Sequence, residues 1–82
     1  MTRRGKLIEK IMSGESDRNI SFAELSRFLE MLGFTGKNTG GSHIVYRKEG
    51  IPPLNIQPAK DGKAKGYQLD QVREIVTRYN LI

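Results

Sequence analysis

The stretch from Ile20 to Gly33 constrains the fold most, because it carries a complete set of signals for one amphipathic helix. Ser21-Phe22-Ala23-Glu24 has the form of a capping box, in which the Ser21 hydroxyl and the Glu24 carboxylate each accept a hydrogen bond from the other residue's amide. Apolar residues then recur at helical spacing, at Phe22, Leu25, Phe28, Leu29 and Leu32. Gly33 suits the left-handed position that ends many helices. The chain therefore has one wide apolar stripe to bury.

Two further segments have a helical pattern. Residues 3–12 place four apolar side chains on one side, at Leu7, Ile8, Ile11 and Met12. The closing segment carries a second strong stripe, at Leu69, Val72, Ile75, Val76 and Tyr79. We expect its other positions to face solvent, at Gln68, Asp70, Gln71, Arg73, Glu74 and Arg78. Phe22, Phe28 and Tyr79 are expected in the core.

Between these helices the pattern changes from helical to alternating. Residues 34–38 and 43–48 flank the turn Asn38-Thr39-Gly40-Gly41, which favours a hairpin. Ile44 and Tyr46 should face one way, and His43, Val45 and Arg47 the other. Pro52 and Pro53 cannot donate to a ladder, so they confine pairing of a third strand to residues 54–57 or mark a sheet edge.

The order of these segments predicts the fold class. Helix, helix, strand, strand, strand and helix give an α+β domain of two layers, with the helices packed on one face of a three-stranded antiparallel sheet. With 82 residues, we expect one small domain over residues 1–82, without a deep substrate cavity. Residues 13–19 are expected to be a loop within it.

Composition limits the functions open to this chain. It has no cysteine and a single histidine, so we expect neither a metal site nor a cofactor. Fourteen Lys and Arg against nine Asp and Glu leave a formal charge of +5, which favours a polyanionic partner, most often nucleic acid. We recognise no signal peptide and no membrane span, so a cytoplasmic protein without a membrane partner is expected.

The most chemically informative stretch is residues 40–48, where the only histidine stands at the start of a predicted strand. An imidazole exchanges protons near neutral pH, which makes His43 a candidate general base. Glycines at positions 40 and 41 leave room for a ligand over the backbone. Arg47 or Lys37 could hold a phosphate. His43 could equally be an ordinary strand-edge residue facing solvent.

Several motifs in order resemble the HicA family over roughly residues 21–81. They are Gly41-Ser42-His43, an aromatic-bearing strand, a third strand rich in Leu and Ile, a lysine-rich loop, and a closing helix over residues 67–75. HicA proteins are the toxins of HicA–HicB toxin–antitoxin pairs. The resemblance implies a fold similar to double-stranded RNA-binding domains, with residues 1–20 as an N-terminal helical extension and loop.

The resemblance also implies a function. It implies metal-independent endoribonuclease cleavage of messenger RNA (mRNA), a catalytic histidine at His43 and a HicB-like antitoxin as partner. This chain departs from the family in two places. Many members have a second histidine directly after the first, where Ile44 stands here, and many have one after the third strand, where this chain has Gln57-Pro58-Ala59. His43 would act as a single base, which predicts slow cleavage.

We expect the RNA to be held by backbone amides and cations. The candidate residues are Lys37, Gly40, Gly41, Ser42, Arg47, Lys48, Lys60, Lys63 and Lys65. The last three stand in a loop over residues 58–66 that we expect to be mobile. Two alternatives stay open, namely an ordinary solvated loop, and an RNA-binding module that recognises shape and phosphates without cleaving. A helix-turn-helix DNA binder is disfavoured, because strands follow where a third helix is needed.

Overall fold

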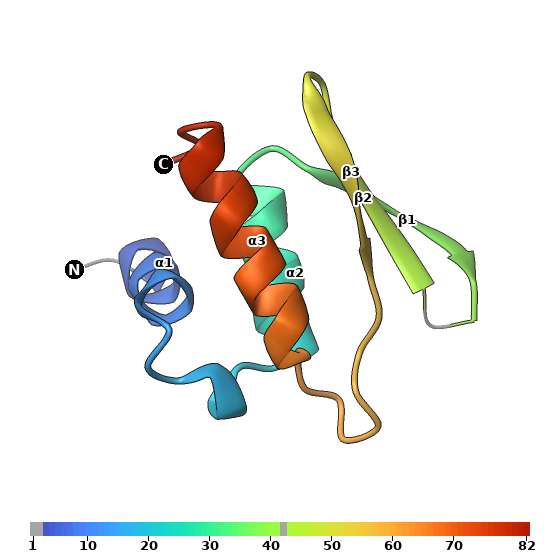
Figure 1. Ribbon diagram of the computed structural model, residues 1–82. Coiled ribbons are helices and arrows are strands. Elements are labelled where there is room, and N and C mark those ends of the chain that lie inside the picture. Colours follow the sequence, from blue (N-terminus) through green and yellow to red (C-terminus); the bar gives the residue numbers. More distant parts are fainter. Residues whose placement is uncertain (1–2, 42) are drawn as a thin grey trace.

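A computed structural model describes residues 3–41 and 43–82, and Figure 1 shows its helices and sheet. The elements, in order, are α1 (Arg3–Ser13), a 3-10 turn η1 (Asp17–Asn19), α2 (Phe22–Met31), β1 (Thr35–Gly40), β2 (His43–Lys48), β3 (Ile51–Ile56) and α3 (Gly66–Arg78). The three strands form one antiparallel sheet in the order β1-β2-β3. The α+β class and the order of the elements predicted from the sequence are confirmed.

The capping box forms at the start of α2 as predicted. The Glu24 amide donates to Ser21 Oγ, and the Ser21 amide donates to Glu24 Oε1, each at 3.0 Å. Ile20 and Leu25, on either side of the cap, are fully buried. Gly33 follows the last turn with a φ of +96°, a value that glycine adopts without strain. Local sequence signals therefore fix both ends of α2.

Lys10 of α1 joins this cap, because its Nζ lies 2.8 Å from Glu24 Oε2. The hydrogen bond from Lys10, followed by the one from the Ser21 amide, lowers the pKa of Glu24 from its ordinary value of 4.5. The pKa of Glu24 is thus lower in the folded state than in the unfolded state. The carboxylate therefore stabilises the fold fully above pH 4.5, and this contribution is lost as the pH falls through the folded-state pKa.

We expect Glu24→Gln to lower the free energy of unfolding by about 0.2–1 kcal/mol at pH 7, because glutamine can still accept from the Ser21 amide but cannot form the ion pair with Lys10. At a pH below the folded-state pKa the difference from the wild type should shrink, because the wild-type carboxyl is then protonated too. Urea denaturation at both pH values measures it. A difference that stays constant with pH would contradict the role given to the Lys10 ion pair.

The helices form two layers on the sheet and not one. Figure 1 shows α2 and α3 next to the sheet, and α1 on the side of these helices that faces away from it. The expected two-layer domain is therefore a three-layer one. Leu7 and Ile11, on the side of α1 that faces α2 and α3, are buried.

Arg73 of α3 fastens this outer layer. Its guanidinium donates to the Ile11 carbonyl at 2.9 Å and to both carboxylate oxygens of Asp17, at 3.0 and 2.8 Å. The Asp17 hydrogen bond is the main cause that raises the pKa of Arg73. The sequence placed Arg73 on the exposed side of the closing helix. That prediction is wrong, because the guanidinium is partly buried and holds α1 to α3.

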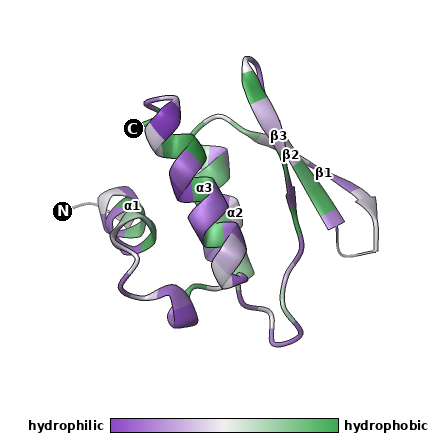
Figure 2. Ribbon diagram, in the orientation of Figure 1, coloured by the Kyte–Doolittle hydropathy of each residue, from purple (hydrophilic) through white to green (hydrophobic). Residues whose placement is uncertain are grey.

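The main core lies between the sheet and the α2–α3 layer. Its largest fully buried side chains include Phe28 and Leu29 of α2, Leu54 and Ile56 of β3, and Leu69 and Val72 of α3. Figure 2 shows hydrophobic residues along β2 and mostly hydrophilic or neutral ones along β1. Phe28 is confirmed as a core residue and Phe22 packs against the core. Tyr79 does not, because 37% of it is exposed after the end of α3.

β3 is an edge strand, which explains its two prolines. Ile51 already pairs with Lys48, so pairing is not confined to residues 54–57 as one prediction had it. A register shift separates this pair from the next, Tyr46 with Leu54. Pro52 and Pro53 fall within this irregular stretch and are exposed. The alternative prediction of a sheet edge is confirmed.

Tyr46 explains a glycine in the neighbouring strand. Gly36 of β1 pairs with Tyr46, and a Cβ at Gly36 would lie 2.6 Å from Cε1 of the ring. The ring is 2% exposed, and its hydroxyl shares a hydrogen bond with Ser26 of α2. Because the ring is held by α2 on one side, it has little room to move away from β1.

We expect Gly36→Ala to destabilise the fold by about 1–3 kcal/mol, the usual cost of overpacking. Gly66→Ala is the matched control, because nothing lies within 4 Å of a Cβ there. The control should leave the thermal unfolding midpoint unchanged or raise it. Equal midpoints for the Gly36 variant and the wild type would show that the Tyr46 ring shifts without cost.

Candidate nucleic-acid interface

The face of the sheet that points away from the helices carries three of the predicted site residues, Lys37, His43 and Arg47. The strand register pairs Lys37 with Val45, Val45 with Asn55, and Thr35 with Arg47. Cross-strand partners share a face, and side chains alternate along a strand. These side chains and His43 therefore lie opposite the buried Tyr46. We call Lys37, His43, Val45, Arg47 and Asn55 the open face.

His43 is the first residue of β2 and is exposed. The prediction that it shares a face with Arg47 is confirmed by the burial pattern of the strand. Arg47 is four positions further along the strand than His43, which is about 13 Å. Lys37 is closer, because it pairs with Val45 and is thus a diagonal neighbour of His43, with about 7–8 Å between such backbone positions. The register favours Lys37 over Arg47 as the cation beside His43.

The β1–β2 turn that presents His43 is held by Asn38. Its Oδ1 accepts from the Gly40 amide at 2.8 Å, and its Nδ2 donates to the Gly41 carbonyl at 3.3 Å. Gly40 and Gly41 have φ values of +141° and +57°. The Gly40 amide thus already has a partner, and it would have to give up this bond to hold a phosphate. Ser42, the other predicted turn residue, lies outside the described residues.

Lys48 does not belong to the open face. It follows Tyr46 by two positions, so it points towards the helices. A Cβ at Gly33 would lie 2.7 Å from Lys48 Nζ, which places this ammonium at the C-terminal end of α2. Cations are favoured at this end of a helix because its carbonyls carry partial negative charge. The position gives Lys48 a structural role that the sequence did not reveal.

The lysine-rich loop, which we expected to be mobile, is hydrogen-bonded to the segment before α2 and to its first residue. The Phe22 amide donates to the Gly62 carbonyl at 3.0 Å, and the Ala64 amide to the Ile20 carbonyl at 2.9 Å. Lys63 Nζ also donates to the carbonyl of Arg18 at 2.9 Å. Lys63 is therefore partly committed to the fold.

The other two lysines of the loop remain candidates for binding phosphate. Lys60 is exposed, and Lys65 is half-buried immediately before α3. β3 leads into this loop from Ile56, whose partner is Ile44, the residue after His43. The loop and His43 thus lie at the same end of the sheet, the lower end in Figure 1, and Arg47 lies towards the opposite end. The predicted site is therefore divided, with His43 and the lysine loop at one end of the sheet and Arg47 towards the other.

Gln68 was predicted to face solvent, and that prediction is wrong. It is 2% exposed. Oriented to match its surroundings, its amide donates to the Gln57 carbonyl at 2.9 Å and accepts from the Gln57 amide at 3.1 Å. Gln57 follows β3 directly. The side chain therefore replaces a neighbouring strand at this point and ties the end of β3 to the first turn of α3.

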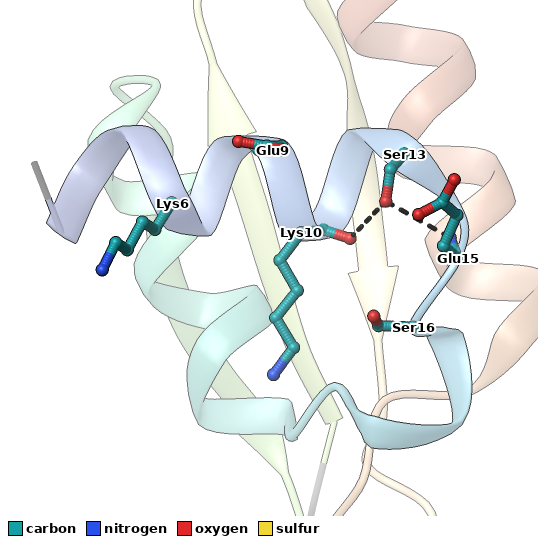
Figure 3. Close-up of a pocket in the computed structure, with 6 residues that line it drawn as sticks. All are labelled: Lys6, Glu9, Lys10, Ser13, Glu15 and Ser16. Atoms are coloured by element: carbon teal, nitrogen blue, oxygen red, sulfur yellow. Dashed lines mark hydrogen bonds between the residues drawn. The ribbon is translucent and has the colours of Figure 1, made fainter. Parts of the chain in front are cut away.

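A hollow on the surface lies elsewhere. Figure 3 shows it along α1, lined by Lys6, Glu9, Lys10, Ser13, Glu15 and Ser16. Ser13 Oγ donates to the Lys10 carbonyl and accepts from the Glu15 amide, each at 3.3 Å. Charges of both signs line it, and none of its residues is a predicted site residue. The candidate interface is an exposed face and not this hollow.

Two features are missing from the part of the chain that the structure describes. Within residues 3–41 and 43–82, no group of three or more histidine or carboxylate side chains is placed to hold a metal ion. The described helices include none that is long and apolar enough to cross a membrane.

Comparison with known proteins identifies no relative, since no family model, curated protein or solved structure matches the chain. The resemblance to HicA toxins therefore stays a prediction from the motifs themselves.

Proposed function

We propose that this protein is a metal-independent endoribonuclease that cleaves mRNA, with His43 as its general base. The position of His43 carries the proposal. It is exposed at the end of β2, with Lys37 as a diagonal neighbour and the lysine loop beyond the same end of the sheet. RNA supplies its own nucleophile, so a base and nearby cations on an accessible surface are sufficient for the chemistry.

The reaction needs two proton transfers, one from the attacking 2′-hydroxyl and one to the leaving oxygen. His43 removes the proton of a 2′-hydroxyl, and that oxygen forms a bond to the adjacent phosphorus. The bond from phosphorus to the 5′ oxygen of the next nucleotide breaks, and the leaving oxygen takes a proton from solvent. Lys37 neutralises charge that builds on the phosphate. One positioned base contributes about 10²–10⁴-fold, so this is a slow enzyme.

The strand register predicts that Lys37 contributes more to the cleavage rate than Arg47 does. We expect Lys37→Gln to slow cleavage about tenfold or more, because its charge acts on the reacting phosphate. Arg47→Gln is the matched control on the same face, about 13 Å from His43 along the strand, and it should mainly weaken binding. Single-turnover rates at saturating protein separate the two effects. A larger rate loss for the arginine variant would reverse the assignment.

The wider biological setting is part of the same proposal. The run α2-β1-β2-β3-α3 has the element order of double-stranded RNA-binding domains, and we propose that fold for it, with α1 as an extension. The HicA-like motifs support a cytoplasmic toxin with a HicB-like antitoxin as partner. An antitoxin that covers the open face would block His43 and Lys37 together.

The ends of the RNA fragments test the chemistry. The purified chain, incubated with an mRNA transcript in the presence of a chelator, should give 2′,3′-cyclic phosphate and 5′-hydroxyl ends. Fragments with 3′-hydroxyl and 5′-phosphate ends would exclude attack by the 2′-hydroxyl.

A non-catalytic RNA-binding module is the second candidate. It is favoured by one observation, that His43 is the only histidine, so no second imidazole can act as the acid. Binding of the transcript without any cleavage would support it.

A further inference from the structure

Tyr67 is the most exposed large hydrophobic side chain of the described residues, with 65% of it accessible. It lies in the first turn of α3, two residues after Lys65. Tyr46, by contrast, is buried in the core. An aromatic ring left in solvent contributes little to the core of this fold.

Hydrogen bonds place Tyr67 at the same end of the sheet as His43. Its hydroxyl lies 3.4 Å from the side-chain amide of Gln68. That amide holds the backbone of Gln57, the residue after β3. The last residue of β3, Ile56, pairs with Ile44, which follows His43. Tyr67 is thus one buried side chain away from the strand end that lies beside His43.

We propose that Tyr67 stacks on an unpaired base, so that the substrate of this surface is single-stranded RNA. The proposal rests on the proposed function. An aromatic ring and lysines along a backbone track are the two components of single-strand binding. In a duplex the bases are already stacked on one another, and an exposed ring can stack only on one that is unpaired. No Phe, Tyr or Trp is among the open-face residues, so Tyr67 is the available platform at this end.

An unpaired substrate also suits the chemistry at His43. Attack by the 2′-hydroxyl needs this oxygen, the phosphorus and the leaving oxygen in line. A nucleotide outside a helix can rotate into that geometry. A base stacked on Tyr67 would fix the RNA beyond the end of the sheet, and a phosphate further along the strand would meet Lys37 and His43 on the face away from α3.

Equilibrium binding tests the proposal, with every variant made in a His43→Ala background so that the RNA stays intact. We expect Tyr67→Ala to weaken binding of an unstructured RNA oligonucleotide about 5- to 150-fold, the range found when a stacked base loses its platform. Binding of a duplex of the same sequence should stay within about twofold. Tyr67→Phe should retain the affinity of the parent. Tyr79→Ala, at the other end of α3, is the matched control and should change neither affinity.

Fluorescence gives a second readout, because the chain contains no tryptophan. Tyr67→Trp introduces the only indole, and we expect single-stranded RNA to quench it and the duplex to leave it unchanged. Tyr79→Trp should be unaffected by either RNA.

The dependence of RNA affinity on salt distinguishes the contribution of base stacking from that of charge. The affinity ratio between Tyr67→Ala and its parent should be the same at low and high salt, whereas Lys60→Gln should reduce the salt dependence itself. An unchanged single-strand affinity for Tyr67→Ala, or an equal loss for both RNAs, overturns the proposal. Neither result depends on cleavage, so failure of His43 as the base would leave this test standing.

Discussion

His43→Ala is expected to lower the rate of RNA cleavage by about 10²-fold or more, the contribution of a positioned general base. The side chain is exposed at the end of β2. Substitutions at such positions normally change the free energy of unfolding by no more than about 0.5 kcal/mol. The variant should therefore fold, and bind RNA and the proposed antitoxin, as the wild type does, and lose only the reaction.

Cleavage of a labelled transcript, a thermal melt and an RNA-binding titration measure these three properties on the same sample. Glu49→Ala, in the exposed turn after β2, is the matched control and should keep the wild-type rate. Cleavage by His43→Ala at the wild-type rate would remove this residue from the mechanism. A large drop in its melting temperature would instead assign His43 a structural role.

Leu29→Ala should be the most destabilising of the variants considered, at about 2–5 kcal/mol. Leu29 is fully buried in the core between α2 and the sheet. A chain of this size has a total stability of roughly 4–12 kcal/mol, so the variant loses a large share of it. The unfolding midpoint should fall by roughly 10 °C or more.

Leu32→Ala is the matched control for this variant, because Leu32 is only half-buried at the end of the same helix. Calorimetry or circular dichroism should show a clearly smaller shift for it. Equal shifts for the two variants would mean that the packing of α2 differs from the one described.

The sequence predicts what depends on residues close together in the chain. The two residues of the cap, Ser21 and Glu24, are three positions apart, and both of their hydrogen bonds were predicted. The alternation along β2 likewise assigned His43 and Tyr46 to opposite faces. Turn composition and edge prolines gave the strand order, because hairpin neighbours are joined by short connections.

The sequence does not predict partners that meet only in the fold. The amide of Gln68 looked like a surface group because its partner, Gln57, lies 11 residues earlier. Lys63 binds a carbonyl 45 residues away, which no local pattern reveals. One signal was available but unused, since Gly36 inside a predicted strand indicates a close approach, here by the Tyr46 ring.

The contact between Arg73 and the Ile11 carbonyl has a consequence for synthesis on the ribosome. The two residues are 62 positions apart. At about 5–20 residues per second, translation takes roughly 3–12 s to cover that distance. Helices form within microseconds. Until α3 arrives, α1 can pack only on α2, so part of its apolar side stays uncovered for seconds, which is the interval in which a chaperone can bind it.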